Sequence, residues 1–113
     1  MFEINGVLWK IKFENPNSEQ LKRSDGSRTV GVTDFNQKTV FLSNLLVGAF
    51  LKRVMAHELC HCFCFSYDID LDIDEEERMA DFIATYGEEL LYLLDDIMRE
   101  IKTRVNKFPS KAI

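Results

Sequence analysis

Residues 44–66 constrain the fold more than any other part of the sequence, because they contain no proline and are apolar on most sides. A run of this length and composition favours a buried helix. It carries both histidines of the chain, His57 and His61, with Glu58 directly after the first. The chain must therefore fold around a helix that brings ionisable side chains into or beside the core.

The spacing of the two histidines indicates a metal site. A helix turns by about 100° per residue, so His57 and His61 lie one turn apart on one face, where two imidazole nitrogens can share an ion. Glu58 is rotated by about 100° from His57 and points past that ion, where a base can take a proton from water. The H-E-x-x-H pattern therefore predicts a zinc hydrolase site, in preference to two histidines packed in a core.

A catalytic zinc needs a third protein ligand, and because no histidine remains it must be a carboxylate or a thiolate. Acidic residues gather at the start of the last predicted helix, at Glu75, Glu76, Glu77 and Asp81. We favour Glu77 as the ligand, with Glu76 as the alternative. Asp81 follows Glu77 by one helical turn and is expected to orient a ligand histidine without binding the metal.

Three cysteines cluster at Cys60, Cys62 and Cys64. Their odd number and alternate spacing on a helix argue against a disulfide framework, so we expect reduced thiols. Cys64 shares the histidine face and is the thiolate alternative for the third ligand, although a small buried side chain is the simpler interpretation.

The remaining pattern predicts a single α+β domain over residues 1–113. Residues 7–13 read as a strand, and residues 28–35 and 38–43 as a hairpin. Ser18 is expected to cap a short helix over residues 19–23. These strands predict a small antiparallel sheet of about three strands, packed on the H-E-x-x-H helix and on a long C-terminal helix.

The C-terminal helix is expected to follow a solvated acidic loop, Asp68–Asp74, with Asp74 as its cap. The pattern continues to Val105, with Gly87 as a weak point near its middle. Basic residues gather towards the C-terminal end, at Arg99, Lys102, Arg104, Lys107 and Lys111. This distribution suits the helix dipole.

Composition excludes several classes of protein. The net charge is −5, which argues against nucleic acid as the main ligand. No run of 18 apolar residues predicts a membrane span, and the first residues lack the pattern of a signal peptide. A cytoplasmic protein is the resulting expectation.

Two stretches carry a family resemblance. "VMAHELCHCF" and "EEERMADFIATYGEELL" resemble the ImmA/IrrE family of zinc metallopeptidases, in the compact form carried by phages and other mobile elements. The family follows its H-E-x-x-H helix with a second helix that opens on E-x-x-A-[ND], matched here by Glu77–Asp81. Over about Lys38–Leu91, the resemblance implies a zincin-like fold, with His57, His61 and Glu77 as zinc ligands and Glu58 as the base.

The resemblance implies hydrolysis of peptide bonds in a protein or peptide substrate, such as a phage or mobile-element repressor or another transcriptional regulator. The strand over Lys38–Ser43 is a candidate edge for an extended substrate. Tyr67, Tyr86 and Tyr92 are candidates for stabilising the oxyanion. The alternative is a zinc-containing binding module that acts on a regulator without proteolysis, but the intact Glu58 argues against it.

Overall fold

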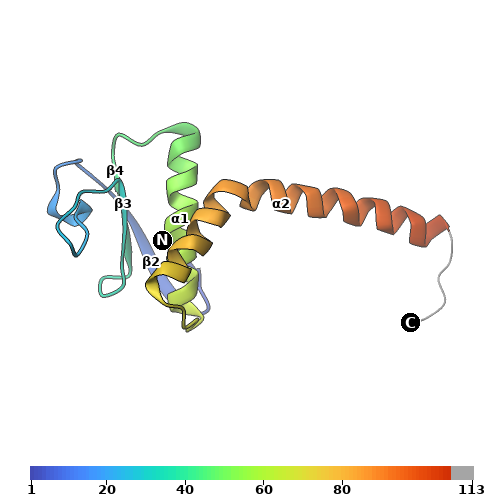
Figure 1. Cartoon of the computed structure of the whole chain (residues 1–113), viewed down its shortest axis with the longest axis horizontal. Coiled ribbons are helices and arrows are strands. Elements are labelled where there is room, and N and C mark those ends of the chain that lie inside the picture. Colours follow the sequence, from blue (N-terminus) through green and yellow to red (C-terminus); the bar gives the residue numbers. More distant parts are fainter. Residues whose placement is uncertain (108–113) are drawn as a thin grey trace.

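The computed structural model describes the backbone of residues 1–107 and the side chains of residues 1–104; Lys111 of the predicted basic end lies outside this part. Its elements, in chain order, are β1 (Phe2–Ile4), β2 (Val7–Glu14), the 3-10 helix η1 (Glu19–Leu21), β3 (Gly31–Asp34), β4 (Thr39–Ser43), α1 (Gly48–Ser66) and α2 (Ile73–Lys107). Figure 1 shows the sheet, α1 and the first turns of α2 side by side. The α+β class and the two helices match the prediction.

The sheet is larger than expected and is not purely antiparallel. Its four strands lie in the order β1-β2-β4-β3, with β2 and β4 parallel and the two outer pairs antiparallel. The strand at Val7 and the β3–β4 hairpin were predicted, whereas β1 was not. Asn5 and Gly6 join β1 to β2 with φ values of 48° and 81°, the positive values that a tight two-residue hairpin requires.

The prediction that Lys38–Ser43 is a substrate edge is wrong. β4 pairs with β2 on one side and with β3 on the other, and all five of its residues are buried. The hairpin partner β3 occupies the edge instead. The error arose because the β2–β4 pairing is parallel and spans a long connection, which leaves no local signal in the sequence.

The main core lies between the sheet and α1. Trp9 on β2 is fully buried, and its Nε1 donates a hydrogen bond to Ser66 Oγ at the end of α1, at 2.9 Å. The core also contains Ile4, Val40, Leu42, Leu46 and Cys62, with Leu51, Val54, Met55 and Leu59 of α1 packed against it. The Trp9–Ser66 bond satisfies the indole donor and ties the end of α1 to the sheet.

Both long helices begin at residues other than those predicted. α1 begins at Gly48, four residues later than the pattern suggested, and Gly48 has a φ of 59° that favours glycine. α2 begins at Ile73, where Asp72 Oδ1 accepts a 2.8 Å hydrogen bond from the Glu75 backbone N–H. Asp72, and not Asp74, therefore caps α2, and the loop before it is shorter than expected.

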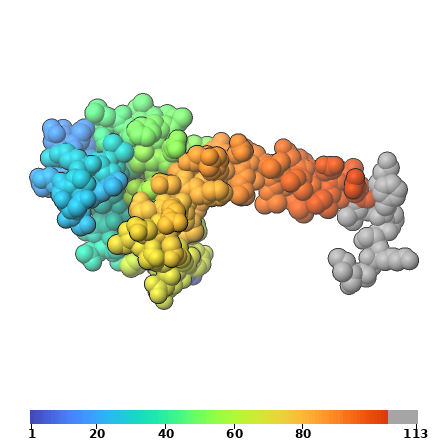
Figure 2. Space-filling model, in the orientation of Figure 1, coloured from blue at the N-terminus to red at the C-terminus, as the bar shows by residue number. Residues whose placement is uncertain are grey.

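The two parts of α2 have different surroundings. Its first turns pack on α1, and the remainder extends away from the rest of the molecule (Figures 1 and 2). The helix is continuous through Gly87, so the predicted weak point does not interrupt it. Within the described residues, neither α1 nor α2 has a stretch apolar enough to cross a membrane.

β3 approaches α1 closely at Gly31. A Cβ placed on Gly31 would lie 2.8 Å from Val54 Cγ1 and 3.3 Å from Glu58 Oε2. Both contacts are shorter than ordinary van der Waals separations, and a β-branched valine has little freedom to move. Glycine at this position therefore lets the edge strand lie against the helix that carries the histidines.

We expect Gly31→Ala to lower the free energy of unfolding by about 1–3 kcal/mol, the usual cost of overpacking. Chemical denaturation followed by the fluorescence of the single tryptophan measures the loss. Val54→Ala removes the side chain that a Cβ on Gly31 would meet first. Val54→Ala should therefore lower the free energy of unfolding by less in the Gly31→Ala variant than in the wild type. Additive losses would contradict the proposed contact.

Candidate metal centre

The candidate site lies where the start of α2 crosses α1. Cys60 and Cys64 of α1 and Ala80 of α2 form a small buried cluster at the crossing. Ala80 is fully buried, and its small side chain permits a close approach of the two helices. This contact places Glu77 and Asp81, one helical turn apart, opposite the histidines of α1.

Three side chains converge on one point. His57 Nε2 and His61 Nε2 lie 3.3 Å apart, and the Glu77 carboxylate lies 3.2 Å from the first and 2.9 Å from the second. Among the described residues, these three form the one group of histidine, cysteine and acidic side chains whose donor atoms gather closely enough to hold a metal ion. The predicted ligand set is thus brought together by the fold.

Each imidazole is held by a second carboxylate on its other nitrogen. Asp81 Oδ1 lies 2.9 Å from His57 Nδ1, and Glu76 Oε2 lies 2.8 Å from His61 Nδ1. The expected orienting role of Asp81 agrees with this geometry. Glu76, weighed as an alternative ligand, contacts the outer nitrogen of His61 and so has the orienting role as well.

The donor atoms at the centre suit a cation. A neutral imidazole whose Nδ1 carries the proton presents a lone pair at Nε2, and the carboxylates beside both Nδ1 atoms favour that tautomer. Two imidazole lone pairs and an acceptor-only carboxylate then face one another at about 3 Å. Such an arrangement is repulsive unless a positive charge lies between the three groups. His57, His61 and Glu77 therefore fit a metal ion.

Glu58 lies beside this centre but is held by the sheet. Its Oε1 accepts a 2.9 Å hydrogen bond from Thr33 Oγ1 on β3, and the residue is 6% exposed. Burial raises the pKa of the Glu58 carboxyl, while the Thr33 hydrogen bond and the nearby His57 oppose this change. A carboxylate with a raised pKa, fixed next to a metal site, has the properties of a proton acceptor.

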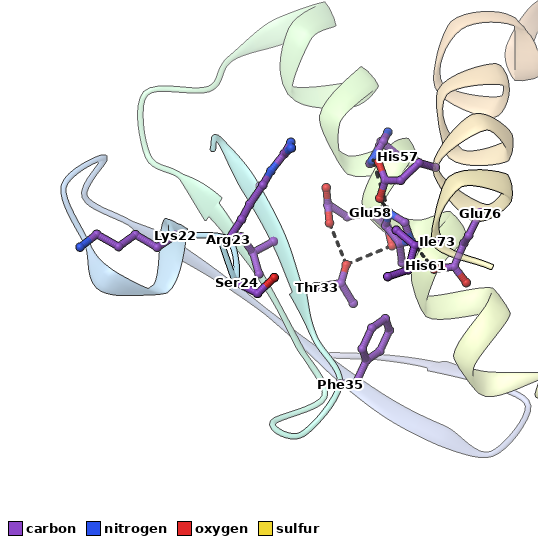
Figure 3. Close-up of a pocket in the computed structure, with 13 residues that line it drawn as sticks. Lys22, Arg23, Ser24, Thr33, Phe35, His57, Glu58, His61, Ile73 and Glu76 are labelled. Atoms are coloured by element: carbon purple, nitrogen blue, oxygen red, sulfur yellow. Dashed lines mark hydrogen bonds and ion pairs between the residues drawn. The ribbon is translucent and has the colours of Figure 1, made fainter. Parts of the chain in front are cut away.

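A cleft of about 420 Å³ opens onto the site, with β3 and the loop before it on one wall and the two helices on the other (Figure 3). Arg23 lines this cleft and also the neighbouring cavity that reaches His57. Neither of these two cavities is lined by Tyr67, Tyr86 or Tyr92, the predicted oxyanion candidates. Three cationic side chains line these cavities instead: Lys22 in the first, Arg53 in the second and Arg23 in both.

The three cysteines are buried and unpaired. Burial raises the pKa of Cys62 to about 12, and burial together with the neighbouring Glu76 raises that of Cys64 to about 12. The predicted reduced state agrees with this arrangement. Cys64 packs against Ala80 and is absent from the converging group, so its alternative role as a ligand is not supported.

Sequence reasoning missed the groups that the sheet contributes. Thr33 and Gly31 reach Glu58 only because the edge strand lies against α1, and Arg23 reaches the cleft from a turn. A threonine in a short strand and an arginine in a polar turn carry no local signal for such roles. The site residues on the two helices, by contrast, share a recognisable spacing.

A scan against protein-family models and searches of curated proteins and of solved structures found no match to this chain. Its function is therefore inferred from the motifs and from the geometry of the site.

Loss of a residue that only orients a metal ligand typically lowers metal affinity by roughly 10–100-fold. We expect Glu77→Ala to lower it by more, because this change removes a proposed ligand. Metal content after dialysis against a weak chelator measures this. Glu75→Ala is the matched control, since Glu75 lies two residues away with an exposed side chain. Wild-type retention in Glu77→Ala would refute the ligand assignment.

The thiols are expected to be unreactive in the folded protein. Thiolate is the reactive form, and a pKa of about 12 leaves almost none of it for Cys62 and Cys64 at neutral pH. Titration with a chromogenic disulfide reagent at pH 7.5 should label these two slowly before denaturation and all three cysteines rapidly afterwards. Rapid native labelling of either would contradict the described burial.

Proposed function

We propose that this protein is a zinc-dependent peptidase of the zincin-like type, related to the ImmA/IrrE family that its motifs resemble. The observation that carries the proposal is the convergence of His57, His61 and Glu77 with Glu58 beside them. The first three supply a metal site, and the fourth is placed to accept a proton. A purely structural site has no need of the fourth group.

Zinc suits the separations of the donor atoms. Tetrahedral zinc with bonds of about 2.0–2.1 Å has ligand atoms roughly 3.3–3.4 Å apart. The two Nε2 atoms lie 3.3 Å apart, and the Glu77 oxygens lie 3.2 and 2.9 Å from them. Two imidazoles and one carboxylate are a protein donor set typical of catalytic zinc sites.

When bound, zinc lowers the pKa of a water molecule and polarises a carbonyl group. The residues of the chain then handle the protons. Glu58 takes the proton from the attacking water and returns it to the leaving amine, while Thr33 holds the Glu58 side chain in place by its hydrogen bond. Asp81 and Glu76 keep the two imidazoles oriented.

The edge strand β3 is the proposed binding site for an extended substrate. β3 pairs with β4 on one side only, and its residues line the cleft beside Glu58. A peptide added at this edge would run past the histidines and bring a scissile bond to the site. Arg23, which lines the same cleft, is suited to interact with the carbonyl oxygen or with an acidic side chain of the substrate.

We expect Glu58→Gln to retain the fold and the metal but to lose about 10²–10⁴ in peptidase rate, because the amide cannot accept the proton. Zinc-loaded wild type and variant are incubated with a complex mixture of unstructured peptides, and new termini are counted by mass spectrometry. Glu75→Gln, an equivalent change outside the site, should cleave at the wild-type rate.

Equal cleavage by the wild type and by zinc-loaded Glu58→Gln would overturn the mechanism. If the wild type cleaves no peptide, Glu58→Gln serves as bait for a candidate regulator. Binding of a regulator by both forms without cleavage would instead support the zinc-containing binding module.

A further inference from the structure

Between Gly87 and Arg104, α2 has an apolar face that no other element covers within the described part of the chain. Six side chains follow one another along it, and each is between 44% and 58% exposed: Leu90, Leu91, Leu94, Ile97, Met98 and Ile101. We call these six residues the α2 stripe. Figure 2 shows the segment extending away from the sheet and α1. A single helix in water is marginally stable, and an exposed stripe of this kind needs a partner.

The spacing of the α2 stripe matches helix-to-helix pairing. Leu90, Leu94, Ile97 and Ile101 are separated by four, three and four residues, as in the seam of a coiled coil. Leu91 and Met98 broaden the seam on one side. The seam is centred between Asp95 and Asp96, so a two-fold axis at this point would set Leu94 against Ile97 and Leu90 against Ile101.

Charge along the same segment differs between its two ends. Residues 88–96 contain four acidic and no basic side chains, whereas residues 97–104 contain three basic and one acidic. An antiparallel pair of identical helices sets the acidic end of each copy against the basic end of the other. A parallel pair would set like charges together. Most of these charged side chains point away from the seam, and Asp96 and Arg99 already form an ion pair within one helix. The charges therefore favour the antiparallel arrangement through longer-range attraction between the two ends, and not through ion pairs across the seam.

We propose that two copies of this chain associate through the α2 stripe as an antiparallel helix pair. Six half-exposed side chains in each copy would bury on the order of 1,000 Å² in total, the lower bound for a specific interface. A membrane surface fits less well, because helices that bind it carry mostly basic polar faces. The stripe begins 13 residues after Glu77, about 20 Å along the helix, so the pairing is separate from the metal centre.

Sedimentation equilibrium of the full chain over a wide concentration range tests the association. The expected species has twice the 13.2 kDa mass of the chain. Changing Leu94 and Ile97 together to Gln should raise the dissociation constant by about 100-fold or more, because these residues face each other at the centre of the interface. Tyr92→Gln is the matched control: Tyr92 is 62% exposed on the same segment but lies outside the stripe.

Cysteine cross-linking tests the orientation. Ile101→Cys combined with Leu90→Cys should form a covalent dimer under mild oxidation, whereas Ile101→Cys alone should not, because the two copies of residue 101 are about 16 Å apart in the antiparallel pair. The native cysteines are buried and do not compete. Helix content by circular dichroism and metal content check that each variant is folded.

Four outcomes would overturn the proposal. A monomer at all concentrations excludes self-association, and a dimer unchanged by the Leu94 and Ile97 substitutions places the interface elsewhere. Cross-linking of Ile101→Cys alone indicates a parallel pair. A monomer that binds anionic phospholipid vesicles, and loses that binding with the double Gln change, assigns the stripe to a membrane surface.

Discussion

The contact between Ala80 and the two cysteines of α1 is the constraint on which the site depends. The buried side chains of Ala80, Cys60 and Cys64 are small, so the first turns of α2 can approach α1 closely. Because Glu77 and Asp81 flank Ala80, the approach brings both carboxylates to the histidine face. A larger side chain at the crossing would push the two helices apart and so separate the carboxylates from the imidazoles.

The acidic start of α2 serves both the helix and the site. Asp72 caps α2, and Asp74, Glu75 and Glu76 occupy its first turn, where backbone N–H groups and the helix dipole stabilise negative charge. From the first turn onwards, Glu76, Glu77 and Asp81 meet the two imidazoles. So many carboxylates in one place repel one another, and a metal cation held among them would offset that repulsion. The same density of acidic residues explains why the sequence pattern before α2 indicates a solvated loop.

Elements whose pattern lies within a short stretch of sequence were predictable. Elements that depend on pairing between residues distant in the chain were not. His57 and His61 lie four residues apart on one helix, so their shared face followed from helical geometry alone. The hairpin of β3 and β4 has adjacent strands and was also recognised. The parallel pairing of β2 with β4 joins residues that are distant in the chain, and it decides that β3 is the edge beside Glu58.

The sequence by itself determined the two helices, the candidate ligands and the candidate base beside them, because helical periodicity and side-chain chemistry act over a few residues. The tertiary structure decided that Glu77 faces the Nε2 atoms while Glu76 and Asp81 face the Nδ1 atoms. It also decided that Thr33 holds Glu58 and that the second half of α2 extends beyond the domain. These features depend on how separate elements cross, and the angle and depth of a crossing are set by packing across the whole core.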